Sequence, residues 1–264
     1  MTASPDPPDP PGPPDPQGPQ GPALRHRATA SLAGRVARWR GAPALHPSGV
    51  RFTGTLAVAP AGPALGEPWL DRPGRYRTDV RWSRAAGVPA WCPDGLGLAL
   101  RVTDAGGPGR PLDLLFTTSG GGRRTRHLPL ARRNAMAGPY STLLSYRVGA
   151  HRRLLALTPA PGSPRVRGDL AGLRQALRTE PLVFVLCTVR DGEPWRALGT
   201  LATGPPSDAP PGSTSSYDPY LNALPGLRPT SRLSGFRESA YAGSRSGRSG
   251  LPPRPVSATG RPPG

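Results

Sequence analysis

One stretch near the C-terminus carries side chains that together could hold a metal ion through a phenolate oxygen. Arg237, Tyr241, Arg245 and Arg248 fall at i, i+4, i+8 and i+11, and on a helix these positions share one face. Cations one turn away favour the ionised phenol of Tyr241, and a phenolate is a ligand suited to ferric iron. The alternative is a surface helix with solvated arginines, in which Tyr241 packs against the rest of the protein.

Other residues favour the first interpretation, because the stretch resembles the proximal segment of the haem catalases. That family has an Arg, the axial Tyr four residues later, a Thr or Ser three after the Tyr and an Arg seven after it. The matching residues are Arg237, Tyr241, Ser244 and Arg248. The approach to this segment is also similar, with matches at Tyr217, Pro219, Asn222, Pro225, Gly226, Leu227, Pro229 and Thr230.

The N-terminal half carries further matches to the same family. Catalases open their first barrel strand with a distal His followed by Gly at +3 and +8, as His46, Gly49 and Gly54 do. Later strands are matched by Val80-Arg81-Trp82-Ser83, by Asp94 with Gly97 to Arg101, and by Asp113-Leu114-Leu115. The matches keep the family's order over residues 45–248, about three quarters of the chain.

On the distal side, the resemblance implies that His46 is the general acid–base. It would take a proton from the peroxide and return it to the leaving oxygen. Ser83 stands where a Ser orients the imidazole from behind. Thr117 lies at or beside the position of an Asn that holds peroxide, and a hydroxyl does not copy an amide.

On the proximal side, the resemblance implies haem b as the cofactor and Tyr241 as its axial iron ligand. Arg81 and Arg248 match residues that pair with the haem propionates, and Arg237 matches the Arg that keeps the axial Tyr ionised. Arg245 extends the same arginine face and is grouped with the cofactor-binding residues. Pro43 replaces another propionate-pairing Arg.

Several departures from the catalase pattern favour slower chemistry than rapid disproportionation of hydrogen peroxide. The family's long N-terminal arm, wrapping segment and C-terminal helical domain have no counterpart, and the crossover at 120–126 is short and polar. A more open pocket would suit organic hydroperoxides together with an electron donor.

The elements that must position these residues are mainly short strands. Period-two patterns and turn residues predict eight strands and an α+β fold, a closed eight-stranded antiparallel barrel with a few helices. Helices are predicted over 29–39, 169–177 and 231–248. The predicted strands are 49–59, 76–84, 96–103, 111–118, 140–147, 151–159, 181–190 and 195–203.

Composition bounds the domain. The chain has 264 residues, of which 36% are hydrophobic. Residues 1–22 and 249–264 are rich in Pro and poor in apolar residues, so both tails are expected to be disordered. A single haem-binding barrel is expected over 23–248.

The net charge of +18 leaves open a basic nucleic-acid-binding barrel. All 34 basic residues are Arg, and the chain has neither Lys nor Ile, which indicates a GC-rich genome rather than a polymer partner. Aromatic residues make up 6% and are scattered, whereas such a barrel would show stacking aromatics between basic residues.

Other features predict a cytoplasmic protein without a membrane segment. The N-terminus shows no signal-peptide pattern, and the longest apolar run, at 181–189, is too short to cross a bilayer. Cys92 and Cys187 are isolated and suit neither a disulfide scaffold nor a metal site. A monomer or weak homodimer is expected.

Three functions remain open from the sequence. The first is a haem catalase or peroxidase that acts on a small hydroperoxide, and the second is a non-catalytic haem protein for sensing or storage. The third is the nucleic-acid-binding barrel. A metal-dependent hydrolase has no support, because His26, His127 and His151 are isolated from any metal-ligand spacing.

Overall fold

The computed structural model describes residues 48–85, 88–207 and 216–230. Both predicted tails and the predicted helices over 29–39 and 231–248 lie outside these ranges. The strands around the core are β1 (Ser48–Val58), β2 (Gly74–Arg84), β3 (Leu96–Val102), β4 (Leu112–Thr118), β5 (Tyr140–Ser141), β7 (His151–Pro159), β8 (Val183–Val189) and β9 (Arg196–Pro206). The other described elements are α2 (Pro68–Asp71), the 3-10 turn η1 (Thr125–His127), β6 (Tyr146–Val148), α3 (Leu170–Thr179) and β10 (Leu227–Pro229).

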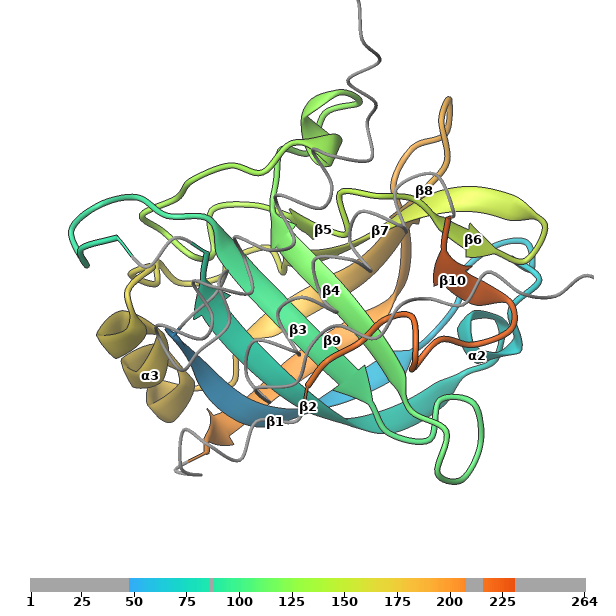
Figure 1. Ribbon diagram of the computed structural model, residues 1–264, viewed down its shortest axis with the longest axis horizontal. Coiled ribbons are helices and arrows are strands. Elements are labelled where there is room, and N and C mark those ends of the chain that lie inside the picture. Colours follow the sequence, from blue (N-terminus) through green and yellow to red (C-terminus); the bar gives the residue numbers. More distant parts are fainter. Residues whose placement is uncertain (1–47, 86–87, 208–215, 231–264) are drawn as a thin grey trace, which may run out of the picture.

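Eight of these strands close into an antiparallel barrel, which confirms the predicted fold class. The order is β1-β2-β3-β4-β5-β7-β8-β9, and β9 pairs again with β1. The short strands β6 and β10 add to the edge of β7 (Figure 1). Closure pairs the backbone groups that an open sheet would leave exposed at its edges.

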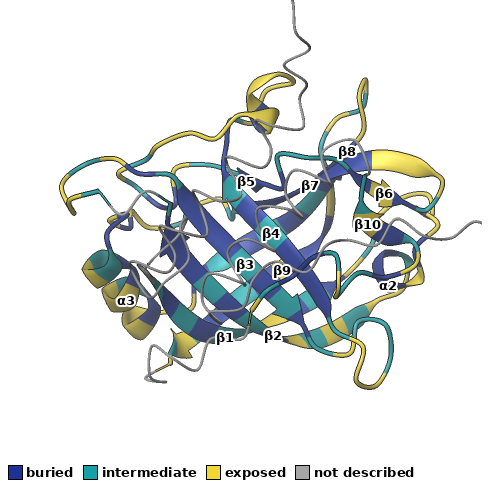
Figure 2. Cartoon of the chain, viewed as in Figure 1, coloured by how far each residue is buried: buried dark blue, intermediate teal, exposed yellow. Residues whose placement is uncertain are grey.

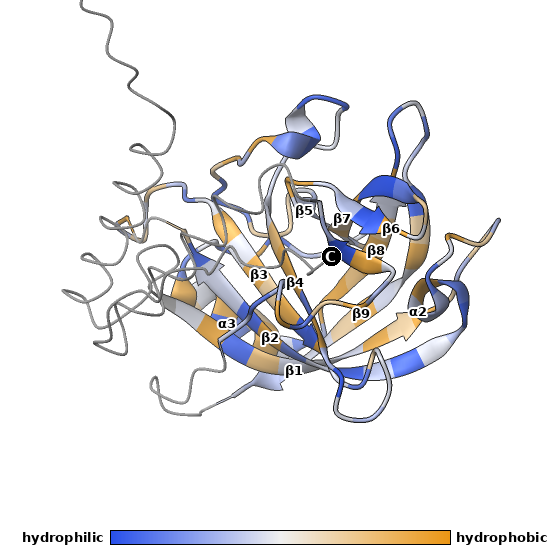
Figure 3. Ribbon diagram, turned by 45° about the vertical axis from the view of Figure 1, so that its right-hand side comes forward, coloured by the Kyte–Doolittle hydropathy of each residue, from blue (hydrophilic) through white to orange (hydrophobic). Residues whose placement is uncertain are grey.

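Strict alternation of apolar and other residues explains why these segments form barrel strands. In β3, the side chains of Leu96, Leu98, Leu100 and Val102 are all buried and point inward, and β4 repeats the pattern. Every second residue of both strands is buried, and the residues between them are partly exposed except for Gly97 and Asp113, which are also buried (Figure 2). Apolar residues concentrate on the strands, while polar residues fill the connecting loops (Figure 3).

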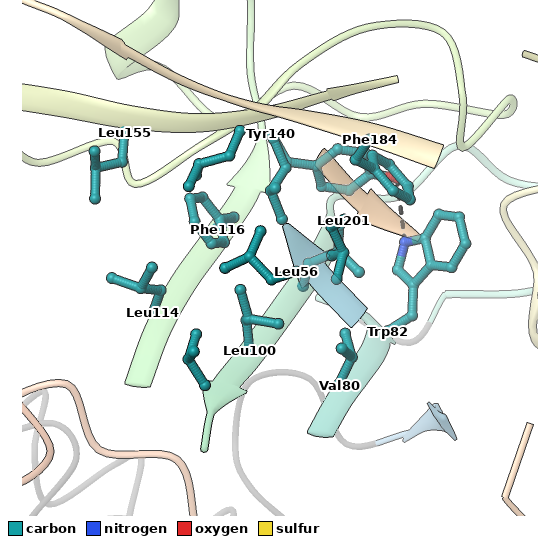
Figure 4. Packing of buried hydrophobic residues seen from close by; sticks show 14 of the residues in the cluster. Leu56, Val80, Trp82, Leu100, Leu114, Phe116, Tyr140, Leu155, Phe184 and Leu201 are labelled. Carbon is teal, nitrogen blue, oxygen red and sulfur yellow. Dashed lines mark hydrogen bonds between the residues drawn. The ribbon is translucent and has the colours of Figure 1, made fainter. Parts of the chain in front are cut away.

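The barrel interior is filled by apolar side chains around a group of four aromatic rings. Trp82 makes edge-to-face contacts with Phe52, Tyr140 and Phe184, with ring centroids 5.8–6.4 Å apart. Its Nε1 donates to the Tyr140 hydroxyl at 3.2 Å, and that hydroxyl donates to the Ala135 carbonyl at 2.7 Å. Figure 4 shows the rings of Trp82, Tyr140 and Phe184 pointing toward one another across the barrel. A ligand of any size therefore has to bind outside the interior.

The predicted fifth strand, over 140–147, is divided into β5 and β6. Between them Leu143 has a positive φ of 56°, which a strand does not accommodate. Side chains also compete with the ladder, because Thr142 Oγ1 donates to the Leu144 carbonyl and Ser141 Oγ donates to the Arg126 carbonyl. The result is a bend that lets β6 form a two-residue hairpin with β7 through Gly149, whose φ is also 56°.

Helix α3 confirms the prediction over 169–177 and lies at one end of the barrel beside β1 and β2 (Figure 1). Asp169 caps it by accepting a hydrogen bond from the Gly172 N–H at 2.9 Å. Leu173 and Leu177 are buried on its inner face. Helix α2 was not predicted, although a Glu at the N-cap and a Pro at the first position are a recognisable start signal.

Candidate functional site

The outer face of β1 to β4 is the surface on which Ser83 and Thr117 lie, two of the predicted distal residues. Because side chains alternate along a strand, each residue between two core positions points outward. The register places these outward residues in three cross-strand rows. The rows are Gly49–Ser83–Gly97–Thr117, Arg51–Arg81–Ala99–Leu115 and Thr53–Asp79–Arg101–Asp113.

The first row holds two hydroxyl side chains separated by a glycine. Ser83 is almost fully buried, and its Oγ donates to the Gly97 carbonyl at 3.3 Å. Thr117 is partly exposed on β4, two strands away. Strands are spaced about 4.8 Å apart, so the two residues are separated by roughly 10 Å along the row. A ligand as wide as two strand spacings would therefore touch both.

The second row brings two arginines side by side. Arg51 and Arg81 are directly opposed on β1 and β2, and both are partly buried. A β-carbon on Gly49 would lie 3.2 Å from the Arg81 guanidinium carbon and 2.8 Å from the Trp82 carbonyl oxygen. Glycine is therefore needed at residue 49 for this packing. The other motif glycine, Gly54, lies at a register shift between β1 and β9.

The third row contains a buried carboxylate that binds four donors. Asp113 has no exposed surface, and it accepts from Arg101 Nε at 2.7 Å and from the second Arg101 nitrogen at 2.6 Å. It also accepts from the Asp218 backbone N–H at 2.7 Å and from Asn222 Nδ2 at 2.8 Å. This bidentate pair raises the pKa of Arg101 and fixes its side chain on the outer face.

Through Asp113, the segment 216–230 is held across β3 and β4 on the way to β10 (Figure 1). The Asp113 N–H also donates to the Asn222 carbonyl at 2.9 Å. At its far end, Thr230 donates from both N–H and Oγ1 to the Ser145 carbonyl. The approach segment and the β4 motif, which were matched separately in the sequence, thus form one hydrogen-bonded unit.

Tyr217 lies on this face with its hydroxyl buried and without a hydrogen-bond partner. The Arg101 guanidinium lies 5.4 Å from the ring centroid, in a cation–π contact. Burial raises the pKa of Tyr217 to about 12, although Arg51 acts in the opposite direction. The phenol is therefore neutral at physiological pH and can donate a hydrogen bond.

The structure brings together the predicted residues that it describes. Arg81, Ser83 and Thr117 share the outer face of β2 to β4, in adjoining rows. The neighbouring Thr118 has a structural role instead, since it donates to the Leu130 carbonyl and accepts from the Leu96 N–H. The remaining predicted site residues lie outside the described ranges and stay predictions: His46, Arg237, Tyr241, Arg245 and Arg248.

Sequence reasoning did not assign roles to Arg51, Arg101, Asp113 or Tyr217. Arg101, Asp113 and Tyr217 were named only as motif matches. Their contacts join positions more than a hundred residues apart, as for Asp113 and Asn222. The one signal in the sequence was Asp113 itself, because a charged residue inside the apolar strand 112–118 needs an oppositely charged or hydrogen-bonding partner.

Taken together, the outer face of β1 to β4 has small residues at its centre and arginines beside them. Gly97 and Ala99 carry little or no side chain, so a flat group could approach the sheet closely there. Arg51 and Arg81 supply positive charge next to that centre. Ser83 and Thr117 supply hydroxyl groups on the other side of it. These features suit a planar ligand that bears carboxylate groups.

Comparison with solved structures defines the class of fold. The barrel is similar to a fungal catalase at 12% identity, covering 77% of this chain and 59% of that chain with a TM-score of 0.57. It is similar to catalase A from Saccharomyces cerevisiae at 11% identity, with coverages of 77% and 60% and a TM-score of 0.56. A bacterial catalase matches at 13% identity, with coverages of 88% and 62% and a TM-score of 0.58.

The chain therefore has the catalase-type barrel fold over most of its length. It spans about three fifths of the length of these catalases. No protein-family model matches the sequence, and no curated protein does. Among the helices of the described ranges, none is long and apolar enough to cross a membrane.

Proposed function

We propose that the chain binds haem b on the outer face of β1 to β4 and acts as a catalase-like oxidoreductase on hydrogen peroxide or organic hydroperoxides. Tyr241 would be the axial iron ligand and His46 the acid–base group. One observation carries the proposal. Arg81, Ser83 and Thr117, which were selected by motif alone, lie together on one face of a catalase-type barrel.

The described residues fit one side of such a cofactor. Gly97 and Ala99 leave room for a flat macrocycle, and the Arg81 guanidinium could pair with a propionate. Arg51, directly opposite Arg81, adds a second positive charge. Like charges opposed on neighbouring strands are unfavourable, and an anionic group between them would offset that cost.

Haem would supply the iron at which the O–O bond of the hydroperoxide is split. The protein would supply proton transfer and orientation. The His46 imidazole would accept the hydroperoxide proton and return it to the departing oxygen. Ser83 is placed behind the face, where its hydroxyl could orient the imidazole. Arg237 and Arg245 would favour the ionised form of Tyr241.

Thr117 favours slow turnover. An Asn can donate through an amide N–H and accept through its carbonyl, whereas the Thr hydroxyl has a single donor. Peroxide would therefore be held less firmly on this face, and reduction by an electron donor would compete with disproportionation. The same residue favours the second candidate function, a haem protein for sensing or storage that turns over little peroxide.

The test uses the full chain reconstituted with haemin, with visible spectra of the wild type and of Tyr241→Phe. A high-spin ferric tyrosinate spectrum that is lost in Tyr241→Phe would support the cofactor and its ligand. Tyr220→Phe is the matched control, because Tyr220 lies in the described segment 216–230, outside the proposed axial motif, and the change should leave the spectrum as it is. Equal spectra for wild type and Tyr241→Phe would refute the assignment.

Turnover is measured next on the haem-loaded protein, with hydrogen peroxide and with an organic hydroperoxide plus a reductant. General acid–base assistance is worth about 100-fold or more, so His46→Ala should lose at least that factor with its spectrum intact. A haem-loaded wild type without turnover would instead support the sensing or storage function.

A further inference from the structure

A second candidate site is a cavity of about 180 Å³, lined by residues outside the three rows of the proposed haem face. Three segments form its walls: the β2–β3 loop at Ala90–Cys92, the chain at Arg132 and Arg133, and the entry to α3 at 167–169. None of these residues belongs to the outer face of β1 to β4. Three of the eight lining residues are arginines, and a single acidic residue, Asp169, lies among them.

The walls of the cavity are held in place by hydrogen bonds independent of any ligand. Arg132 and Asp94 exchange backbone hydrogen bonds, and the Gly168 N–H donates to the Arg133 carbonyl at 2.8 Å. The buried Arg84 holds the β2–β3 loop by donating to the Cys92 carbonyl at 3.0 Å and to two other carbonyls. The cavity is therefore preorganised rather than a gap between loose loops.

Charge in the cavity is not balanced by the protein. Asp169 is already paired with Arg167, at 2.8 Å from Nε, and caps α3. Arg132 donates to the Ser119 carbonyl, yet its other terminal nitrogen is buried without a partner. Burial lowers the pKa of Arg132, which is the direction expected for a cation without a carboxylate beside it. An anion in the cavity would lie beside Arg132 and offset the desolvation of its guanidinium.

Size and surroundings narrow the chemistry of that anion. At about 30 Å³ per water molecule, the cavity holds the equivalent of about six waters, which is too small for a drug-sized or dinucleotide ligand. It suits one tetrahedral oxyanion. Trp91 lines the cavity with 76% of its surface exposed, so its ring offers an apolar surface to whatever the oxyanion carries.

We propose that this cavity binds a phosphate group, through Arg132, Arg133 and Arg167, either as the free ion or as the end of a small ester whose organic part lies on Trp91. The site is separate from the proposed haem face and does not depend on it. Positive charge from the three arginines that line the cavity favours a dianion over chloride.

The test is calorimetric titration of the full chain with inorganic phosphate at constant ionic strength, with chloride as the comparison anion. We expect saturable binding of one phosphate, and a loss of affinity of about tenfold in Arg133→Gln, because a hydrogen bond to a charged group is removed. Arg133 is exposed, so the variant should fold. Arg165→Gln is the matched control, since Arg165 is also exposed and does not line the cavity. It should change affinity by less than about twofold.

The control matters because a chain of net charge +18 attracts anions everywhere. Equal losses in the two Arg variants, or equal binding of chloride, would show general attraction and overturn the proposal. Phenyl phosphate separates the two sources of the oxyanion. Tighter binding than phosphate that is lost in Trp91→Leu assigns the site to an ester, and equal binding of the two assigns it to the free ion.

Discussion

Replacing Asp113 by Asn should destabilise the protein and detach the segment that leads toward Tyr241. Asp113 is fully buried and accepts two hydrogen bonds from Arg101, one from the Asp218 N–H and one from Asn222. An Asn of the same shape keeps one acceptor oxygen and turns the other into a donor that faces donors. The negative charge that neutralises Arg101 is lost as well.

The size of the effect follows from these contacts. If the remaining oxygen takes the place of Oδ2, the bond from Arg101 Nε is lost, and one hydrogen bond to a charged group is worth about 1.5–3 kcal/mol. Breaking a buried ion pair by removing one partner costs about 3–5 kcal/mol. Because 21% of the Arg101 side chain is accessible to solvent, the expected loss of stability lies near the lower end of this range, at about 3 kcal/mol.

Urea unfolding followed by tryptophan fluorescence measures this change, with Asp79→Asn as the control. Asp79 occupies the same cross-strand row and flanks Arg101 from the other side, but it is partly exposed. Its replacement should cost less than about 1 kcal/mol. A loss below about 1 kcal/mol in Asp113→Asn, or equal losses in both variants, would refute the role given to Asp113.

Hydrogen exchange then tests whether the segment is released. In Asp113→Asn the amides of Asp218 and Asn222 should exchange faster, while β8, on the opposite side of the barrel, keeps its protection. Faster exchange throughout the barrel would mean that Asp113 supports the fold as a whole, and would contradict its assignment as the point at which the segment is attached.

Two further predictions concern buried or capping groups whose titration is coupled to folding. Tyr140→Phe should lose about 1–3 kcal/mol at neutral pH, because Trp82 Nε1 and the Ala135 carbonyl lose their shared partner. Burial raises the pKa of Tyr140, so the wild type should lose more stability than the Phe variant as pH rises above about 10. Unfolding curves at neutral pH and above about pH 10 check this. Asp169→Ala should cost about 1 kcal/mol at neutral pH through loss of the α3 cap. Burial acts to raise the pKa of Asp169, but the hydrogen bonds from Gly172 and Arg167 lower it overall. The stability difference between the wild type and Asp169→Ala should therefore shrink as pH falls below about 4. A difference that does not depend on pH would contradict the assignment.

Much of the barrel was predictable because its strands obey a local rule. Apolar residues at every second position, with turn residues between the runs, were enough to find all eight barrel strands and their closure. The division of the fifth strand depends on Leu143 and on side-chain hydrogen bonds at Ser141 and Thr142, which no hydrophobic pattern reveals. Strand β10 forms only because β6 lies beside it, so its signal is tertiary.

The candidate site likewise has a part that a local pattern predicts and a part that depends on contacts between distant segments. Alternation alone places Arg81 and Ser83 outward, because Val80 and Trp82 must face the core, and the motif supplied their proposed roles. The cavity proposed to bind phosphate could not be predicted, since its arginines come from two segments that are joined by contacts such as those of Arg133 with Gly168 and of Asn134 with Val166. Contacts over such distances leave no pattern in a single sequence.

The packing of the barrel interior also determines where this protein can bind a ligand. Eight-stranded barrels are at the size where side chains either fill the interior or leave room for one small ligand. Here Trp82, Tyr140 and Phe184 fill it, so ligand recognition has to use the outer surface. The outer face of β1 to β4 is crossed by the segment that Asp113 holds, and that segment ends at the described Thr230, eleven positions before Tyr241. The barrel thus carries Arg81, Ser83 and Thr117 on the same face as the attachment of the segment that leads toward Tyr241, and the cofactor proposed to bind there would require this arrangement.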